Sequence, residues 1–204
     1  MKDAQSPQTQ ERRYRRTEKL ILDGLTTLLQ EKSIKNITVR ELSDLVDINR
    51  STFYLHYTDI YDLLEKTEHR LLEQLQAAAA EEWRDEFNPN HFFLFLEQSF
   101  TILAENAPLC SALMGANGDI AFLRTIEGLV REKGIQTLHT FAPADISEHD
   151  LQYVTTYVLT GCVGLVGHWL NNGCPESPTH MAELCLLLLR EGISSIKVTP
   201  ELKR

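Results

Sequence analysis

Residues 49–57 bring together many side chains that can bind phosphate groups or the edges of DNA bases. The set comprises Asn49, Arg50, Ser51, Thr52, Tyr54, His56 and Tyr57. Arginine can donate two hydrogen bonds to guanine, and hydroxyl groups commonly bind phosphates. Because Phe53 is the core anchor expected in this segment, most of the other side chains must face outward. The segment therefore predicts a surface that enters a DNA major groove or, alternatively, an ordinary solvated helix surface.

Two short helices joined by a tight turn are expected to position these side chains. Thr38 and Glu41 have the spacing of a capping box, which would start the first helix. Asp47 falls at the turn, where Asp tolerates left-handed backbone geometry better than most residues. Asn49 can cap the second helix. Two short helices that cross steeply at such a turn are typical of a helix-turn-helix unit.

The rest of the chain predicts more helices and an all-α fold. A first helix is expected from about residues 13–17 to 31, with residues 1–11 disordered, and a long helix from about 58 to 82. Later helices are expected at about 92–105, after Pro108, and at about 120–140, 148–171 and 178–194. Apolar residues that repeat at helical spacing should face the N-terminal core: Leu20, Ile21, Leu25, Leu28, Leu29, Val39, Leu42, Leu45, Val46, Ile60, Leu63, Leu64, Leu71, Leu72 and Leu75.

Charge is divided unevenly along the chain, whose net charge is −9. Residues 1–57 hold ten Lys or Arg against eight Asp or Glu, whereas residues 58–204 hold ten against twenty-one. A mildly basic end on an acidic body would let DNA meet one end only. The polar N-terminus lacks the apolar stretch of a signal peptide, and the longest apolar run is broken by glycines. We therefore expect a cytoplasmic protein without a membrane span.

Residues that could support catalysis are scattered. The seven histidines form no HExxH motif, and neither a GxSxG elbow nor a phosphate-binding loop is present. His149 stands between Glu148 and Asp150, as expected of a solvated helix start. Four cysteines without CxxC spacing fit a reducing compartment. The sequence predicts no enzyme, no metal ion and no cofactor.

Residues 17–64 resemble the DNA-binding domain of the TetR family of bacterial transcriptional regulators. The motifs are Ile37-Thr38-Val39-x-Glu41-Leu42, then Val46-x-Ile48-x-Arg50-Ser51-Thr52-Phe53-Tyr54-x-His56-Tyr57, then Leu63-Leu64. Two positions depart from the family pattern. Asp47 stands where Gly is usual in the turn, and Ile60 stands where a Lys often touches phosphate. The resemblance implies a homodimeric regulator, usually a repressor, that leaves a palindromic double-stranded DNA operator when a small-molecule effector binds.

The resemblance also implies a division of labour along the chain. Residues 12–64 would form the helix-turn-helix DNA-binding domain, and residues 65–204 a helical regulatory and dimerisation domain. Carried over by position, the expected DNA contacts are Thr38, Arg50, Ser51, Thr52, Tyr54, His56 and Tyr57. The basic run at residues 12–16 could follow the DNA backbone or remain a solvated tail.

Three glycines stand inside one predicted helix, at positions 161, 164 and 167. Glycine costs about 1 kcal/mol in a helix interior, so the close approach of another helix is the simplest reason for them. That helix could belong to the same chain or to a second copy. In the TetR family the last two long helices form the dimer interface. The resemblance thus implies an interface with Gly161, Gly164, Gly167, Met181, Leu184, Cys185 and Leu188.

A ligand pocket is expected among the helices of residues 89–170. Its candidate wall residues are Phe93, Gln98, Phe100, Met114, Phe122, Tyr153, Tyr157 and Trp169, although aromatic residues at helical spacing are also typical of a plain core. The sequence does not name the effector. An alternative hypothesis is a co-regulator whose C-terminal domain binds a protein partner.

Overall fold

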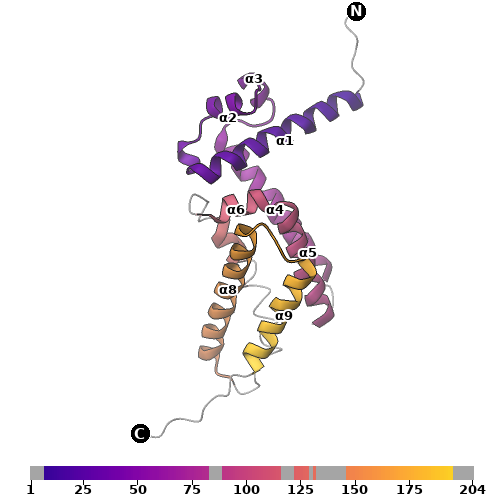
Figure 1. Cartoon of the computed structure of the whole chain (residues 1–204), viewed down its shortest axis with the longest axis vertical. Helices are drawn as coiled ribbons and strands as arrows, with labels where there is room; N and C mark the ends of the chain where they lie inside the picture. Colours follow the sequence, from indigo (N-terminus) through magenta and orange to yellow (C-terminus); the bar gives the residue numbers. More distant parts are fainter. Residues whose placement is uncertain (1–6, 83–88, 116–121, 129–130, 132–145, 195–204) are drawn as a thin grey trace, which may run out of the picture. The chain divides into compact units, whose positions relative to one another are not determined.

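The computed structural model describes residues 7–82, 89–115, 122–128, 131 and 146–194. This part of the chain is helical and contains no strand, which confirms the predicted all-α class. The elements (Figure 1) are α1 (Pro7–Glu31), the short 3-10 helix η1 (Ile34–Asn36), α2 (Val39–Leu45), α3 (Arg50–Phe53), α4 (Ile60–Glu82), α5 (Pro89–Glu105), α6 (Ala107–Met114), α8 (Glu148–Asn171) and α9 (Pro178–Ser194). Residues 122–128 are also helical, and most of the remaining helix expected at 120–140 lies outside the described residues.

The described residues form two compact units. The first takes those within Met1–Leu71 and Ala112–Asp119, and the second takes those within Leu72–Ser111 and Ile120–Arg204. Helix α4 therefore contributes its first half to one unit and its second half to the other. The domain boundary expected after residue 64 stays a sequence-based prediction.

Helix α1 begins earlier than the sequence predicted. It starts at Pro7, inside the segment that was expected to lie outside the helix. Proline suits a first turn because the N–H that it lacks would have no acceptor within the helix there. Ile21 and Leu25 are fully buried, but Leu20 is 40% exposed, so its predicted inward position is wrong. Leu20 lies just outside the apolar stripe, which covers one face of the helix.

Gly24 allows α2 to lie close against α1. A Cβ atom at Gly24 would lie 2.4 Å from Val46 Cγ1 and 2.8 Å from Leu42 Cδ1, so any side chain there would overlap its neighbours. Leu42 is fully buried, whereas Leu45 is 50% exposed, which contradicts its predicted inward position. With only seven residues, α2 packs against α1 and α3, and Leu45 lies on the part of its surface that faces solvent.

Capping hydrogen bonds start both short helices. The Glu41 N–H donates to Thr38 Oγ1 at 3.2 Å, and the Ser51 N–H donates to Asn49 Oδ1 at 3.0 Å. Both predicted N-caps are confirmed. The Glu41 carboxylate pairs with Lys32 rather than completing a capping box with Thr38.

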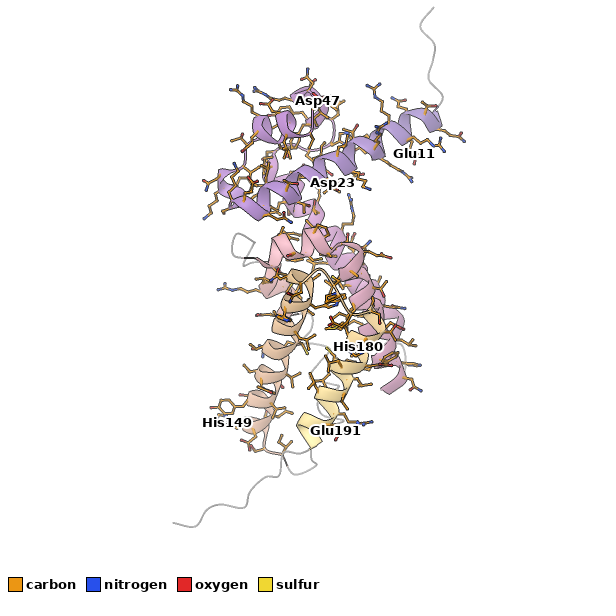
Figure 2. The ribbon with its side chains drawn as sticks, in the orientation of Figure 1. Glu11, Asp23, Asp47, His149, His180 and Glu191 are labelled. Carbon is orange, nitrogen blue, oxygen red and sulfur yellow. The ribbon has the colours of Figure 1, made fainter. Side chains whose placement is uncertain are left out.

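The turn between α2 and α3 is built around Asp47, which Figure 2 labels at this turn. Asp47 has a φ angle of 53°, so the predicted left-handed conformation is confirmed. The Ile48 N–H then donates to the Ser43 carbonyl oxygen at 3.0 Å. Asp and Asn are among the few residues with a side chain that adopt this conformation readily. The turn therefore forms without the glycine that is usual at this position.

In the second unit, α9 packs along α5 and also contacts α8. Figure 1 shows α8 and α9 as an antiparallel pair. A buried cluster joins the three helices through Phe92, Leu151 and Leu189. Nearer the turn between α8 and α9, Trp169 meets Phe100 edge to face, with ring centroids 5.3 Å apart. These contacts fix α5, α8 and α9 as the core of the unit.

The ends of α8 and α9 fall where the sequence predicted. Ser147 Oγ accepts from the Asp150 N–H at 3.0 Å, which confirms the predicted N-cap of α8. Gly173 and Cys174, with φ angles of 79° and 54°, end this helix in the left-handed region. Proline opens α9 at Pro178. Residues 143–145 of the predicted loop before α8 lie outside the described residues.

Candidate DNA-binding and dimerisation surfaces

The first turn of α3 presents polar side chains to solvent while its apolar anchor is buried. Phe53 is fully buried and meets Tyr54 edge to face at 5.6 Å between ring centroids. Of the predicted DNA contacts, Thr52 is half-buried and the exposed ones are Thr38, Arg50, Ser51 and Tyr54. Within the described part of the chain, no carboxylate pairs with Arg50. Its guanidinium is therefore available to bind an external anion.

Tyr57 does not belong to this exposed set. It is 4% exposed, which contradicts the prediction that it faces outward as a DNA contact. Its hydroxyl donates to Glu18 Oε1 at 3.4 Å, and Arg70 donates to the same oxygen at 2.7 Å. Burial and the Glu18 carboxylate raise the pKa of Tyr57 to about 12. Through Glu18, the residue joins the segment after α3 to α1 and α4.

His56 is half-buried against α1 rather than fully exposed. Its ring stacks on that of Tyr14, with centroids 3.9 Å apart. Its Nδ1 atom is buried and has no hydrogen-bond partner among the described residues. Desolvation lowers the pKa of His56, although the Glu18 carboxylate opposes this shift. Nδ1 of His56 therefore lies on the side of the ring that is turned away from solvent.

Three residues of this network were missed by the sequence analysis: Tyr14, Glu18 and Arg70. The hydrogen bonds of Glu18 span 39 and 52 positions of the chain. No helical spacing relates residues so far apart, so only the tertiary fold brings them together. The signal that was present in the sequence is an acidic residue just after the basic run of α1.

The basic run at the start of α1 is exposed. Arg15 pairs with Glu11 one turn earlier, and Figure 2 labels Glu11 on this helix. Within the described residues, Arg12, Arg13 and Arg16 have no carboxylate partner. They add positive charge to the unit that carries Arg50, which favours an approach to phosphate groups.

The glycines of α8 face open space. A Cβ atom added at Gly161, Gly164 or Gly167 would have no atom within 4 Å. The helix that would explain these glycines is therefore not part of the described chain. On the same helix Tyr153 is 66% exposed and Tyr157 is 78% exposed. Both tyrosines are removed from the predicted pocket walls, because side chains this exposed enclose no cavity.

The other predicted interface residues lie on two faces of α9, one buried and one exposed. Met181 and Cys185 are each 4% exposed, so their predicted place on an open interface is corrected to the core of the unit. Leu184 is half-buried and Leu188 is 56% exposed. Leu187, which the sequence analysis did not select, is 50% exposed. Leu187 and Leu188 thus form an outward apolar pair on α9.

A hollow of about 530 Å³ lies between α4 and α5 in the second unit. Its lining residues are Gln74, Ala77, Ala78, Glu97, Gln98, Thr101 and Ile102. Gln98 is the one predicted pocket residue in this set. Glu97 accepts a hydrogen bond from the hydroxyl of Thr179 on α9 at 2.6 Å, which holds its carboxylate at the rim. The hollow offers amide, hydroxyl and methyl groups to a ligand.

The remaining predicted pocket residues are not brought together at this hollow. Phe100 and Trp169 are buried against each other as core residues. Phe122 is buried, Phe93 is half-buried on α5, and Met114 is half-buried at the end of α6 in the first unit. A pocket assembled from the full predicted set stays a prediction.

The described residues were also compared with the requirements of a metal site and of a membrane span. They hold no group of three or more His, Cys, Asp or Glu side chains that could bind a metal ion. None of their helices combines the length and the apolar character that crossing a membrane requires. His149 lies at the exposed start of α8, where its ring meets Tyr153 edge to face at 5.1 Å.

Known proteins provide a further comparison. A TetR-type family model described as "Transcriptional regulator C-terminal region" matches residues 90–191. A TetR-like transcriptional regulator from Rhodococcus sp. RHA1 superposes with a TM-score of 0.63 at 16% identity, covering 88% of this chain and 96% of that one. A TetR transcriptional regulator from Streptococcus agalactiae 2603V gives 0.58 at 21% identity, covering 89% and 98%. FadR from Bacillus subtilis, solved in complex with stearoyl-CoA, gives 0.57 at 16% identity, covering 87% and 98%.

The comparison with curated proteins gave no match. The family model nevertheless spans half of the chain. At the identities given, the solved structures show a shared fold, and they cover most of both chains. The confirmed caps and turn of α2 and α3 agree with the motifs that first indicated the family. This chain belongs to the TetR family of transcriptional regulators.

Proposed function

We propose that the chain is a homodimeric DNA-binding repressor that reads a palindromic operator through α3. The observation that carries the proposal is the exposed Arg50, which pairs with no carboxylate among the described residues, on a short helix whose anchor, Phe53, is fully buried. A rigidly held helix with an outward cation suits a major groove, because the cost of ordering the contact is already met in the free protein.

The contacts divide into those that read bases and those that bind phosphates. Arg50 lies in the first turn of α3 and can donate two hydrogen bonds to guanine. Ser51 and Tyr54 carry exposed hydroxyls for phosphates or base edges. Thr38 Oγ1 already accepts from the Glu41 N–H, but its own hydrogen remains free to donate to a phosphate. Thr52, which is half-buried, completes the set.

The network behind α3 supports this surface. Glu18 accepts hydrogen bonds from Tyr57 and Arg70, so it joins α1, the segment after α3 and α4. The His56 ring packs on Tyr14 of α1. With Nδ1 buried, only Nε2 of His56 could reach a phosphate. We propose Tyr57 as a support residue and not as a DNA contact.

A second copy of the chain is the proposed partner of α8 and α9. The open glycine positions of α8 would allow another helix to approach closely, and Leu188 on α9 would add apolar contact. Two-fold symmetry would place two α3 helices against half-sites about one turn of DNA apart. Dimerisation would thus give a reason for glycines inside a helix. It would also require a palindromic operator.

The hollow between α4 and α5 is the proposed effector site. It lies in the unit that the family model matches and is lined by the amides of Gln74 and Gln98. Effector binding would release the operator by favouring a conformation with lower DNA affinity. The chemical class of the effector is not part of the proposal.

A second candidate function is that of a co-regulator that binds a protein partner and holds DNA weakly. The observation that favours it is Ile60, which is 4% exposed where a phosphate-binding Lys is usual in the family. A buried isoleucine supplies no contact to the DNA backbone. Recovery of a stoichiometric protein partner, together with DNA binding that stays weak and unspecific, would favour this function over the first.

Selection of bound sequences from random DNA duplexes is the experiment that tests the repressor proposal. The purified full chain should enrich a palindrome, and its affinity should fall steeply as salt concentration rises, because phosphate contacts release counterions. Arg50→Ala should weaken binding by about 1–3 kcal/mol and relax specificity at one base position in each half-site. Arg190→Ala, which removes an exposed arginine of α9, is the matched control and should bind normally.

Failure of the proposal would take a clear form. If Arg50→Ala binds the enriched duplex with unchanged affinity and specificity, Arg50 does not contact DNA. If the chain stays monomeric and enriches single half-sites, the proposed dimer is contradicted. Repression of a reporter gene placed behind the selected operator would distinguish a repressor from an activator.

A further inference from the structure

Cys162 and Cys185 lie at the same level of the antiparallel pair formed by α8 and α9. Figure 2 shows the direction of the pair: His149 and Glu191 mark one end, and His180 lies near the other. Cys162 is nine residues before the end of α8, and Cys185 is seven residues after the start of α9. At about 1.5 Å per residue, these positions differ by only about 3 Å along the helix axes.

Both cysteines also lie on the facing sides of their helices. In α8 the buried positions Leu159 and Trp169 flank Cys162 at helical spacing, and in α9 Met181 and Leu189 flank Cys185. The two thiols are in hydrogen-bond contact. A pair of neighbouring thiols from two helices therefore lies inside the second unit.

The two thiols differ in exposure and in acidity. Cys185 is 4% exposed, whereas Cys162 is half-buried, and both are free. The Cys185 thiol donates a hydrogen bond to the Cys162 sulfur, which lowers the pKa of Cys162 and raises the pKa of Cys185. The more accessible sulfur is thus also the more readily ionised one, as an attacking thiolate needs to be.

We propose that Cys162 and Cys185 form a redox modification site that peroxides convert into an intrachain disulfide linking α8 to α9. The Cys162 thiolate attacks one peroxide oxygen and breaks the O–O bond, which gives a sulfenic acid and, with hydrogen peroxide, one water molecule. The Cys185 thiol then attacks the sulfenic sulfur, the S–S bond forms, and the sulfenic oxygen leaves as a second water molecule. The two sulfurs are oxidised and the peroxide is reduced.

The other two cysteines provide a comparison within the same unit. Cys110 lies near Cys174 but is 1% exposed, and burial raises its pKa to about 12. Cys174 follows α8 in a left-handed backbone conformation and is half-buried. A buried thiol that stays protonated reacts slowly with peroxide. We therefore assign the modification to the pair between α8 and α9.

The disulfide would fix the relative position of two helices that the proposed function assigns to the dimer. Its formation does not depend on that assignment, since both sulfurs come from one chain. DNA binding and disulfide formation can therefore be tested separately, and the failure of one leaves the other standing.

The test exposes the reduced full chain to hydrogen peroxide, blocks remaining thiols, digests the chain without reductant and identifies linked peptides by mass spectrometry. The expected product is a single chain that has lost two hydrogen atoms, with Cys162 linked to Cys185. Treatment with dithiothreitol should restore the original mass. On a gel without reductant, the oxidised chain should migrate as one chain and not as two.

Three variants locate the chemistry. Cys185→Ser should stop at the sulfenic acid of residue 162, which dimedone traps. Cys162→Ser should lose both the linked peptide and the dimedone adduct. Cys174→Ser removes a half-buried thiol outside the pair and should form the link as the unchanged chain does. Circular dichroism of each reduced variant verifies that the helices are intact before oxidation.

Several results would overturn the proposal. A link between Cys110 and Cys174 would place the reactive pair elsewhere, and a link between two chains would make the reaction intermolecular. Over-oxidation of residue 162 to the sulfinic acid in the unchanged chain, without any linked peptide, would mean that Cys185 does not resolve the sulfenic acid.

Discussion

Glycines inside helices have opposite surroundings in the two units of this protein. In the first unit, the side chains of Val46 and Leu42 lie so close to Gly24 that a Cβ atom there would force them to shift. In the second unit, a Cβ at Gly161 or Gly164 would meet no atom within 4 Å. The contact that makes glycine necessary is thus present among the described residues at α1, whereas at α8 those residues do not supply it.

This difference relates each unit to its proposed role. The first unit would present a rigid surface to DNA, so its helices are packed tightly on each other and its network of Glu18, Tyr57 and Arg70 is internal. The second unit would assemble with another copy, so part of its helix surface is left uncovered. A glycine in a helix is therefore informative only once its neighbours are known.

The largest expected effect comes from filling the space at Gly24. Gly24→Val should destabilise the first unit by roughly 3 kcal/mol, because overpacking a close helix contact forces α1 and α2 apart. Amide hydrogen exchange should become faster in α1 and α2. Gly161→Val is the matched control, since it places the same side chain in open space, and it should leave exchange in α1 and α2 unchanged. Equal protection of these two helices in both variants would refute the comparison.

The next effect concerns the stability of the first unit at alkaline pH, where Tyr57 hydrogen-bonds to Glu18. The pKa of Tyr57 is raised from its ordinary value near 10 to about 12. A raised pKa stabilises the folded state fully below pH 10, and this stabilisation is lost as the pH rises from 10 to 12, because the unfolded chain loses its proton first. The expected loss is roughly 3 kcal/mol.

Urea unfolding at several pH values between 9 and 12, chosen to bracket the two pKa values of about 10 and 12, measures this loss. Tyr57→Phe should flatten the fall in stability over the window, since it removes the titrating group. Tyr61→Phe removes an exposed tyrosine of α4 and should keep the full slope. If the slopes of the two variants are alike, Tyr57 is not held by the network around Glu18.

Local features of the fold could be predicted from the sequence, whereas features set by distant partners could not. The caps at Thr38, Asn49 and Ser147 and the left-handed Asp47 were predicted correctly, because each depends on residues within a few positions. The ends of α8 and α9 followed from Gly173 and Pro178 for the same reason.

Exposure was harder to predict where the tertiary partner decides it. Tyr57 has the residue type and position of a DNA contact, but it is buried against Glu18, 39 positions away. Tyrosine is a residue type that often lines pockets, and Tyr153 and Tyr157 are nevertheless exposed. Helical periodicity gives the relative direction of side chains on one helix. It does not say which face another helix covers, and that information was missing in each case.

A smaller effect should distinguish the open glycine face from a plain solvated surface. Gly164→Ala should stabilise α8 by about 1 kcal/mol, because alanine favours helix over glycine. If a partner helix packs there, the same methyl group should weaken dimerisation, so helix stability and dimer affinity should change in opposite directions. Analytical ultracentrifugation over a dilution series measures the dimer. Gly128→Ala, at another open helical position, should leave dimer affinity unchanged.

The smallest expected effect compares the N-caps of the two units. Thr38 and Ser147 each accept one backbone N–H, at 3.2 and 3.0 Å. Replacing either by alanine removes that bond, so Thr38→Ala and Ser147→Ala should each cost about 1 kcal/mol of stability in urea unfolding. Only the Thr38 hydroxyl is proposed to donate to a phosphate as well. Thr38→Ala should therefore also weaken operator binding and reduce its salt dependence, whereas Ser147→Ala should leave both unchanged. Equal operator affinity in the two variants would reduce Thr38 to a helix cap and confine the phosphate contacts to α3 and α1.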